Sequence, residues 1–210
     1  MKKLTVTLIA LGLLVGCSGN KTEKDAAEPA MAKTDNLLYQ QASQKMIGSF
    51  GKALKGELLA AMNEGGPIAA INTCATVAPE IAEQYSNEAV SIRRVSDKNR
   101  NLNNGASEYE QQIMAKFAVA EAPAFYEETT DGETGQVYHF YQPIKAGKLC
   151  LNCHGPAETL KPDLLTAIKE TYPEDLAVGY AEGDLRGMFV VEMKLPEAEE
   201  LIKTLVADTL

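Results

Sequence analysis

Residues 136–155 read Gln136-Val-Tyr-His-Phe-Tyr-Gln-Pro-Ile-Lys-Ala-Gly-Lys-Leu-Cys-Leu-Asn-Cys-His-Gly155. The first half of this stretch is rich in aromatic and branched side chains, which favour a strand up to about Ile144. The second half holds Cys150, Cys153 and His154 in the pattern C-x-x-C-H. The stretch therefore joins a predicted strand directly to a motif of two cysteines and a histidine.

The spacing of Cys150, Cys153 and His154 is that of a c-type haem attachment site. Two thiols three residues apart lie on one face of a helical turn, where both can reach the vinyl groups of one porphyrin. The imidazole of the following residue is then placed beside the iron. A thioredoxin-like redox pair would need a βαβ context, and a zinc site would need a second pair of ligands. We therefore predict one covalently attached haem c, with His154 as an iron ligand.

In the rest of the chain, the spacing of apolar residues and the positions of turn-forming residues predict both helices and strands, which follow one another in mixed order along the sequence. Gly65 and Gly66 should end the first helix, and Pro79 should kink the second or start a new segment. Together these elements predict an α+β domain, with an antiparallel sheet flanked by long N-terminal helices and a C-terminal helix. The predicted helices cover 37–63, 68–85, 107–119, 160–170 and 196–207, and the predicted strands cover 89–95, 124–130, 136–144 and 187–194.

The N-terminal residues are typical of an export signal. Lys2 and Lys3 precede an apolar stretch that is too short to span a bilayer comfortably, and Leu14-Val-Gly-Cys17 resembles a lipobox. The alternative is a plain signal peptide with a chance cysteine. We expect a lipoprotein signal peptide over 1–16, a flexible lipid-anchored tether over 17–35 and the haem c-binding domain over 36–210. The protein should then lie at the periplasmic face of a bacterial membrane, and Ser18 favours the outer membrane.

The overall charge argues against one class of partner. The formal net charge is −9, and the chain has no basic stripe that could follow a phosphate backbone. We therefore exclude a nucleic-acid partner. The lipid at Cys17 is the predicted membrane contact.

Cys74 is the cysteine that the other assignments leave unused. Four cysteines in an exported protein could form two disulfides, but lipidation of Cys17 and a haem motif account for three of them. Cys74 falls on the apolar face of the second predicted helix, so it is either a buried structural cysteine or a second iron ligand. Its rivals as ligands are His139, which strand alternation turns away from Tyr138 and Phe140, and two methionines that fit equally well in the core. These methionines are Met188 and Met193.

Arg93, Arg94, Lys98 and Arg100 form the most basic segment of an acidic protein. The two propionates of a partly buried haem would need cationic partners. Arg94, Lys98 and Arg100 are therefore candidate haem-binding residues, although a solvated loop would explain the same run of charge.

Several further segments carry a resemblance to a known family. The chain resembles the single-haem c-type proteins with a PAS-like sheet, related to the haem sensor regions found ahead of some bacterial histidine kinases. The resemblance spans about 37–195 and rests on several motifs besides the haem motif. These motifs are Ala70-Ile-Asn-Thr-Cys74, Ala78-Pro-Glu-Ile-Ala82, Arg93-Arg-Val-Ser-Asp-Lys-Asn-Arg-Asn101, Tyr172-Pro173, Ala177-Val-Gly-Tyr180 and Gly183-Asp-Leu-Arg-Gly187.

The resemblance implies a histidine and cysteine pair of axial ligands, which would be His154 and Cys74 here. It also implies a PAS-like fold and a sensing role. We expect a redox or small-gas-ligand sensor that is not an enzyme, in which a diatomic gas or a change in potential displaces Cys74. Because the chain contains no recognisable output region, the signal would pass to an unknown redox or signalling protein. The alternative is a periplasmic electron-transfer cytochrome. A peroxidase would need an open distal site with an acid–base histidine, for which only His139 is available.

Overall fold

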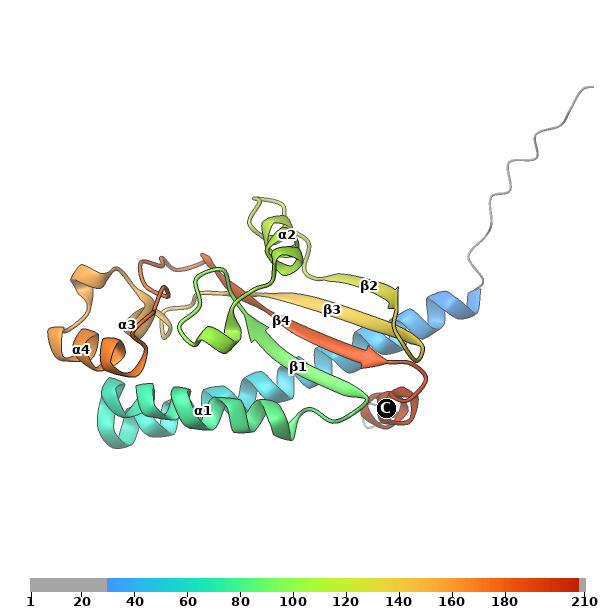
Figure 1. The fold of residues 1–210 in the computed structure, drawn as a ribbon, viewed down its shortest axis with the longest axis horizontal. Coiled ribbons are helices and arrows are strands. Elements are labelled where there is room, and N and C mark those ends of the chain that lie inside the picture. The colour runs from blue at the N-terminus through green and yellow to red at the C-terminus, as the bar shows by residue number, and fades with distance from the viewer. Residues whose placement is uncertain (1–29, 208–210) are drawn as a thin grey trace, which may run out of the picture.

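The computed structural model describes the chain over residues 30–207, with side chains described from residue 36 onward. Long and short helices alternate with four strands, and two single 3-10 turns lie in the loops (Figure 1). The helices are α1 (Ala30–Gln84), α2 (Glu108–Phe117), α3 (Leu151–His154), α4 (Pro162–Thr171) and α5 (Glu199–Ala207). The strands are β1 (Val90–Val95), β2 (Tyr126–Asp131), β3 (Gln136–Lys145) and β4 (Leu185–Lys194).

The four strands form one antiparallel sheet in the order β1-β4-β3-β2. β4 is the last strand in the chain but pairs with both β1 and β3. It therefore lies inside the sheet and links β1 to the β2–β3 hairpin. Helices lie on both faces of this sheet. The predicted α+β class with a PAS-like antiparallel sheet, long N-terminal helices and a C-terminal helix is confirmed.

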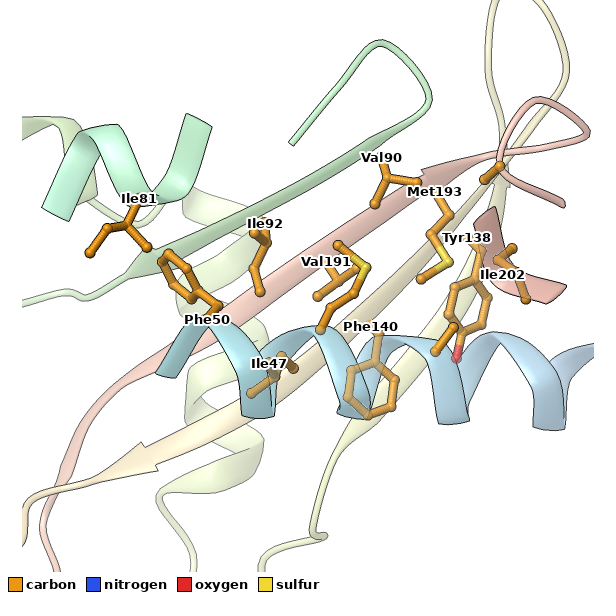
Figure 2. Close-up of a cluster of buried hydrophobic side chains, with 13 residues drawn as sticks. Ile47, Phe50, Ile81, Val90, Ile92, Tyr138, Phe140, Val191, Met193 and Ile202 are labelled. Carbon is orange, nitrogen blue, oxygen red and sulfur yellow. The ribbon is translucent and has the colours of Figure 1, made fainter. Parts of the chain in front are cut away.

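The larger core lies between the sheet and the helices α1 and α5 (Figure 2). Strand alternation supplies it, because Tyr138 and Phe140 of β3 point to the same face as Val191 and Met193 of β4. Phe50 of α1 completes the cluster, and burying a side chain of this size stabilises the fold by roughly 1.5–3 kcal/mol relative to exposure. This face of the sheet is thus filled by hydrocarbon over most of its length.

The opposite face of the sheet is covered by the short helix α2. Ser107 and Glu110 form the predicted capping box, in which each side chain accepts a hydrogen bond from the backbone N–H of the other residue. The helix then buries Ile113 and Phe117 against Met188 of β4. Met188 and Met193 therefore belong to the two opposite cores.

α1 consists of two helical segments that meet at Gly66. Gly66 has φ 71° and ψ −165°, and it is the only residue in α1 with non-helical backbone angles. Figure 1 shows that the chain turns back here, and the ring of Phe50 in the first segment contacts the ring of Tyr85 beyond the second, with centroids 5.8 Å apart. The predicted break at Gly65 and Gly66 is confirmed, whereas no new segment begins at Pro79, because α1 continues through it with helical backbone angles.

The first segment of α1 also begins earlier than expected. It starts at Ala30 rather than at residue 36, so the end of the predicted tether over 17–35 is helical. The predicted signal peptide over 1–16 and the acylated Cys17 lie outside the described residues. No helix within residues 30–207 is both long and apolar enough to cross a membrane.

Candidate functional site

A cavity of about 240 Å³ lies where the second segment of α1 faces β1, α3 and α4. It gathers Cys74, Arg94, Arg100 and the whole cysteine motif from segments that are far apart in the chain. The residues that line it are Leu58, Ala70, Ile71, Cys74, Arg94, Val95, Ser96, Asn99, Arg100, Asn101, Asn104, Ile144, Cys150, Cys153, His154, Tyr172, Arg186 and Gly187.

The cysteine motif forms the one-turn helix α3. The backbone N–H of His154 donates to the carbonyl of Cys150 at 2.9 Å, which brings Cys150, Cys153 and His154 onto one side of a single turn. Gly155 follows the turn, and only glycine fits there because a Cβ would lie 2.7 Å from the carbonyl oxygen of Leu151. Burial raises the pKa of the Cys153 thiol, more than the nearby Arg100 guanidinium lowers it.

The His154 imidazole is held by a single strong contact. Its Nδ1 lies 2.7 Å from the carbonyl oxygen of Ala177, and a carbonyl can only accept, so Nδ1 carries the proton. Burial lowers the pKa of His154 to about 3, helped by the positive charges of Arg186 and Arg100. The ring is therefore neutral at pH 7, with the lone pair on Nε2 free to bind a metal.

Cys74 faces the same cavity from α1. We expected it on a buried helical stripe, but the buried stripe carries Ile71, Ala78 and Ile81, and Cys74 itself is exposed. The thiol is open to solvent on the side of the cavity and enclosed by protein on the others. This enclosure raises the pKa of Cys74, against the lowering effect of Arg94 and Arg100.

The cysteines suit covalent attachment better than a bare metal ion. Cys74, Cys150 and Cys153 are all free thiols, so none of the three possible disulfides among them forms. Within the described part of the chain, no group of three histidine, cysteine or acidic side chains could hold a metal ion. A zinc site of the usual four-ligand kind therefore has no basis among these residues.

The three basic residues predicted to bind haem, Arg94, Lys98 and Arg100, differ in their contacts. The Arg94 guanidinium lines the cavity and makes no hydrogen bond or ion pair within residues 36–207, and burial lowers its pKa. Lys98 does not line the cavity, because its Nζ donates to the carbonyl of Val178 at 2.8 Å and lies over the Tyr180 ring. Arg100 lines the cavity but is already paired with Asp175, with Nε 3.0 Å from Oδ1.

Arg186 and Tyr172 are cavity residues that sequence reasoning missed as site residues. Arg186 donates from Nη1 to Ser96 Oγ at 3.1 Å and lies over the Tyr180 ring, with its Cζ 5.3 Å from the ring centroid. Burial, followed by the effect of the neighbouring Cys74, raises the pKa of Tyr172 to about 12. Both residues fall in the motifs that carry the family resemblance, and these motifs could have identified them as site residues from the sequence.

His139 and the two methionines lie elsewhere. Met188 and Met193 are fully buried in the two cores. His139 is on the α2 face of β3, with Nε2 2.9 Å from Thr130 Oγ1 and Nδ1 3.5 Å from Glu192. We expected a surface histidine, but only 16% of its side chain is exposed, because these polar neighbours cover it.

Comparison with known proteins adds a family to this geometry. A protein-family model described as Tll0287-like matches residues 20–194. A solved structure, that of the cyanobacterial heme-protein Tll0287, is similar to the chain with 26% sequence identity and a TM-score of 0.49. The aligned region covers 80% of this chain and 98% of that one. No curated protein sequence gives a significant match.

Proposed function

The chain belongs to the Tll0287-like family, and we propose that it is an exported single-haem c-type protein that senses a redox change or a small gaseous ligand. The family takes its name from a protein that is described as a heme-protein. The observation that carries the proposal is the position of Cys74, since its thiol and the His154 imidazole line the same cavity although they come from separate elements.

The cavity residues fit a covalently attached haem in their chemistry. The Cys150 and Cys153 thiols would add to the two vinyl groups, each forming a thioether bond and transferring its proton to the adjoining vinyl carbon. His154 would bind the iron through Nε2, because its Nδ1 donates to Ala177. Arg94 is the cavity cation without a partner among the described residues, so it supports a contact with a propionate.

When bound, the haem supplies an iron centre that changes oxidation state and can accept a diatomic gas. His154 and Cys74 would hold the iron from two separate elements, and loss of the Cys74 contact would be the protein's response to a gas or to a change in potential. Cys74 belongs to neither of the two hydrophobic cores on the sheet, so the thiol could move without disturbing them. The proposed function is therefore sensing, and it includes no enzymatic turnover.

The export part of the proposal rests on residues outside the described range. The sequence around Cys17 supports a lipid anchor on the periplasmic side of a membrane. The N-terminal end of α1, drawn in blue, lies at the end of the molecule away from α3 and α4 (Figure 1). This placement would hold the haem cavity away from the membrane, where it could meet a redox or signalling partner.

Optical spectra of the matured protein and of a Cys74→Ala variant test this function. We expect a low-spin ferric spectrum with a thiolate-to-iron charge-transfer band, which Cys74→Ala loses while haem stays covalently attached. Carbon monoxide added to the reduced wild-type protein should replace Cys74. Asn72→Ala, which changes an exposed residue on the same helix, should leave every spectrum unchanged.

Two results would overturn parts of the proposal. A wild-type protein without covalent haem after maturation would remove haem c altogether. A spectrum that Cys74→Ala does not alter, or a reduced protein that takes up no carbon monoxide, would favour the alternative of a periplasmic electron-transfer cytochrome.

A further inference from the structure

Arg100 and Asp175 form a nearly buried ion pair beside the cavity. Nε of Arg100 lies 3.0 Å from Oδ1 of Asp175, and Nη2 lies 3.1 Å from Oδ2, so the pair is bidentate. Only 10% and 9% of the two side chains are exposed. Removing charges from water costs several kcal/mol per ion, which the pair offsets only through good geometry and further hydrogen bonds. The pair therefore needs further hydrogen-bond partners, and it has them on both sides.

Those partners connect the cysteine motif to the loop after α4. Nη2 of Arg100 also donates to the carbonyl of Cys153 at 2.8 Å and to the carbonyl of Ala177 at 3.3 Å. Oδ1 of Asp175 accepts from the backbone N–H of Ala177 at 3.0 Å. The ion pair thus contacts the last cysteine of the motif and both backbone polar groups of Ala177.

The Ala177 carbonyl is the point where this network meets the imidazole. It accepts from Nδ1 of His154 at 2.7 Å and from Arg100 at 3.3 Å. The backbone N–H of Tyr180 donates to the carbonyl of His154 at 2.9 Å, so the same loop also holds the histidine backbone. Any displacement of Ala177 would therefore turn the His154 ring.

We propose that Arg100 and Asp175 are positioning residues that fix the orientation of the His154 imidazole. This inference rests on the proposed haem function and deepens it, because it assigns Arg100 to the histidine rather than to a propionate. Hydrogen-bond partners of a metal-binding histidine set its ring orientation and its basicity. A guanidinium on the shared carbonyl oxygen also reduces how strongly that oxygen draws on the His154 Nδ1–H.

The test separates position from charge by means of Arg100→Lys. Lysine keeps the positive charge but cannot reproduce the planar fork that contacts Asp175 and two carbonyls together. We expect covalent haem to be retained, the g-values of the low-spin ferric EPR spectrum to shift, and the reduction potential to change. The matched control is Arg93→Lys on the other face of the sheet, where Arg93 pairs with Glu110, and it should match the wild type.

A second variant covers the case in which Arg100→Lys does not fold. Asp175→Asn preserves the shape of the side chain and can still accept from Ala177, and it should raise the reduction potential because a negative charge near the iron is lost. The amide can accept only one of the two Arg100 hydrogen bonds, so the Ala177 loop should also shift and change the EPR g-values.

The outcomes distinguish this inference from the proposed function. Wild-type protein without covalent haem would refute the function itself. Haem-loaded variants with wild-type g-values would refute the positioning role alone, since charge by itself would move only the potential.

Discussion

Adjacent residues on one strand serve opposite faces of the sheet and meet different chemistry there. Arg93 and Arg94 follow one another on β1, yet Arg93 lies 2.6 Å from Glu110 on the α2 face while Arg94 lines the cavity. His139 likewise faces Glu192 while its neighbours on β3 enter the large core. Successive side chains of a strand point to opposite faces of the sheet. The cavity therefore lies on one face, and a polar cluster of Arg93, Glu110, His139 and Glu192 lies on the other.

Within this polar cluster, Glu192 should give the protein a pH dependence of its own. Polar contact with His139, followed by the charge of Arg93, holds the pKa of Glu192 below its ordinary value, against the raising effect of burial. A carboxyl whose pKa is lower in the folded state stabilises the fold above its unfolded pKa of about 4.3. That stability is lost as the pH falls through the lower, folded pKa.

We expect Glu192→Gln to be less stable than the wild type at pH 7, by less than about 1 kcal/mol because the group is partly exposed. The difference should shrink towards zero near pH 3. Urea unfolding of both proteins at the two pH values measures it. If the difference in unfolding free energy stays constant with pH, the lost stability comes from packing and not from charge.

At the scale of elements, the break in α1 determines which surface of the helix reaches the cavity. The first segment contributes Met46, Ile47 and Phe50 to the large core, whereas the second contributes Ile81 to that core and Cys74 to the cavity. One uninterrupted helix could not return its chain to the sheet in this way. The left-handed angles at Gly66 supply the turn, and only glycine adopts them without strain.

Gly66→Ala and Gly48→Ala should therefore change stability in opposite directions. Neither new methyl group would meet another atom within 4 Å, so the backbone angles alone decide the effect. Gly66→Ala should cost about 1–3 kcal/mol, the strain of a side chain held at a positive φ with an extended ψ, a region that essentially only glycine adopts. Gly48→Ala, inside the helix, should add about 0.5–1 kcal/mol of stability.

Chemical denaturation of both variants measures these changes. A neutral Gly66→Ala would mean that the break is held by contacts around it and not by glycine. Gly48→Ala serves as the control for the effect of an added methyl group on α1.

At the scale of the whole molecule, the cavity divides two regions that are stabilised differently. The sheet has a core on each face, but α4 packs through a separate cluster of Leu160, Leu164, Ile168 and Tyr172, which reaches α1 at Ile71. α3 and α4 lie at one end of the molecule, beyond the end of the sheet (Figure 1). A group bound in the cavity would therefore contact both regions and join them.

Removing the two cysteines that would attach the haem should increase local opening at the end of the molecule that holds α3 and α4, and not in the sheet. In a Cys150→Ser/Cys153→Ser double variant we expect backbone amides of α3, α4 and residues 175–180 to lose protection from hydrogen exchange. The amides of β3 and β4 should keep theirs, because the sheet retains both cores.

Hydrogen exchange followed by mass spectrometry measures both regions in one experiment. Cys74→Ala, which should keep covalent haem, is the control. Equal loss of protection in the sheet would show that the fold as a whole depends on the haem.

Much of the architecture could be predicted from local pattern. The break at Gly66, the capping box of Ser107 and Glu110, the hairpin and the last strand are all confirmed, and the chain belongs to the Tll0287-like family. The attachment of haem c and the ligand pair of His154 and Cys74 stay predictions. No new segment begins at Pro79, because a helix held by tertiary packing tolerates one missing hydrogen bond.

The sequence by itself determined what depends on neighbours along the chain: the alternation of the strands, the helix ends and the spacing of Cys150, Cys153 and His154. Only the tertiary structure decided which basic side chains remain available in the cavity. Arg94 and Arg100 look alike in sequence, but Asp175 reaches Arg100 from a distant loop and no acidic group among the described residues reaches Arg94. Ion pairs depend on distances through space, and the order of residues does not contain them.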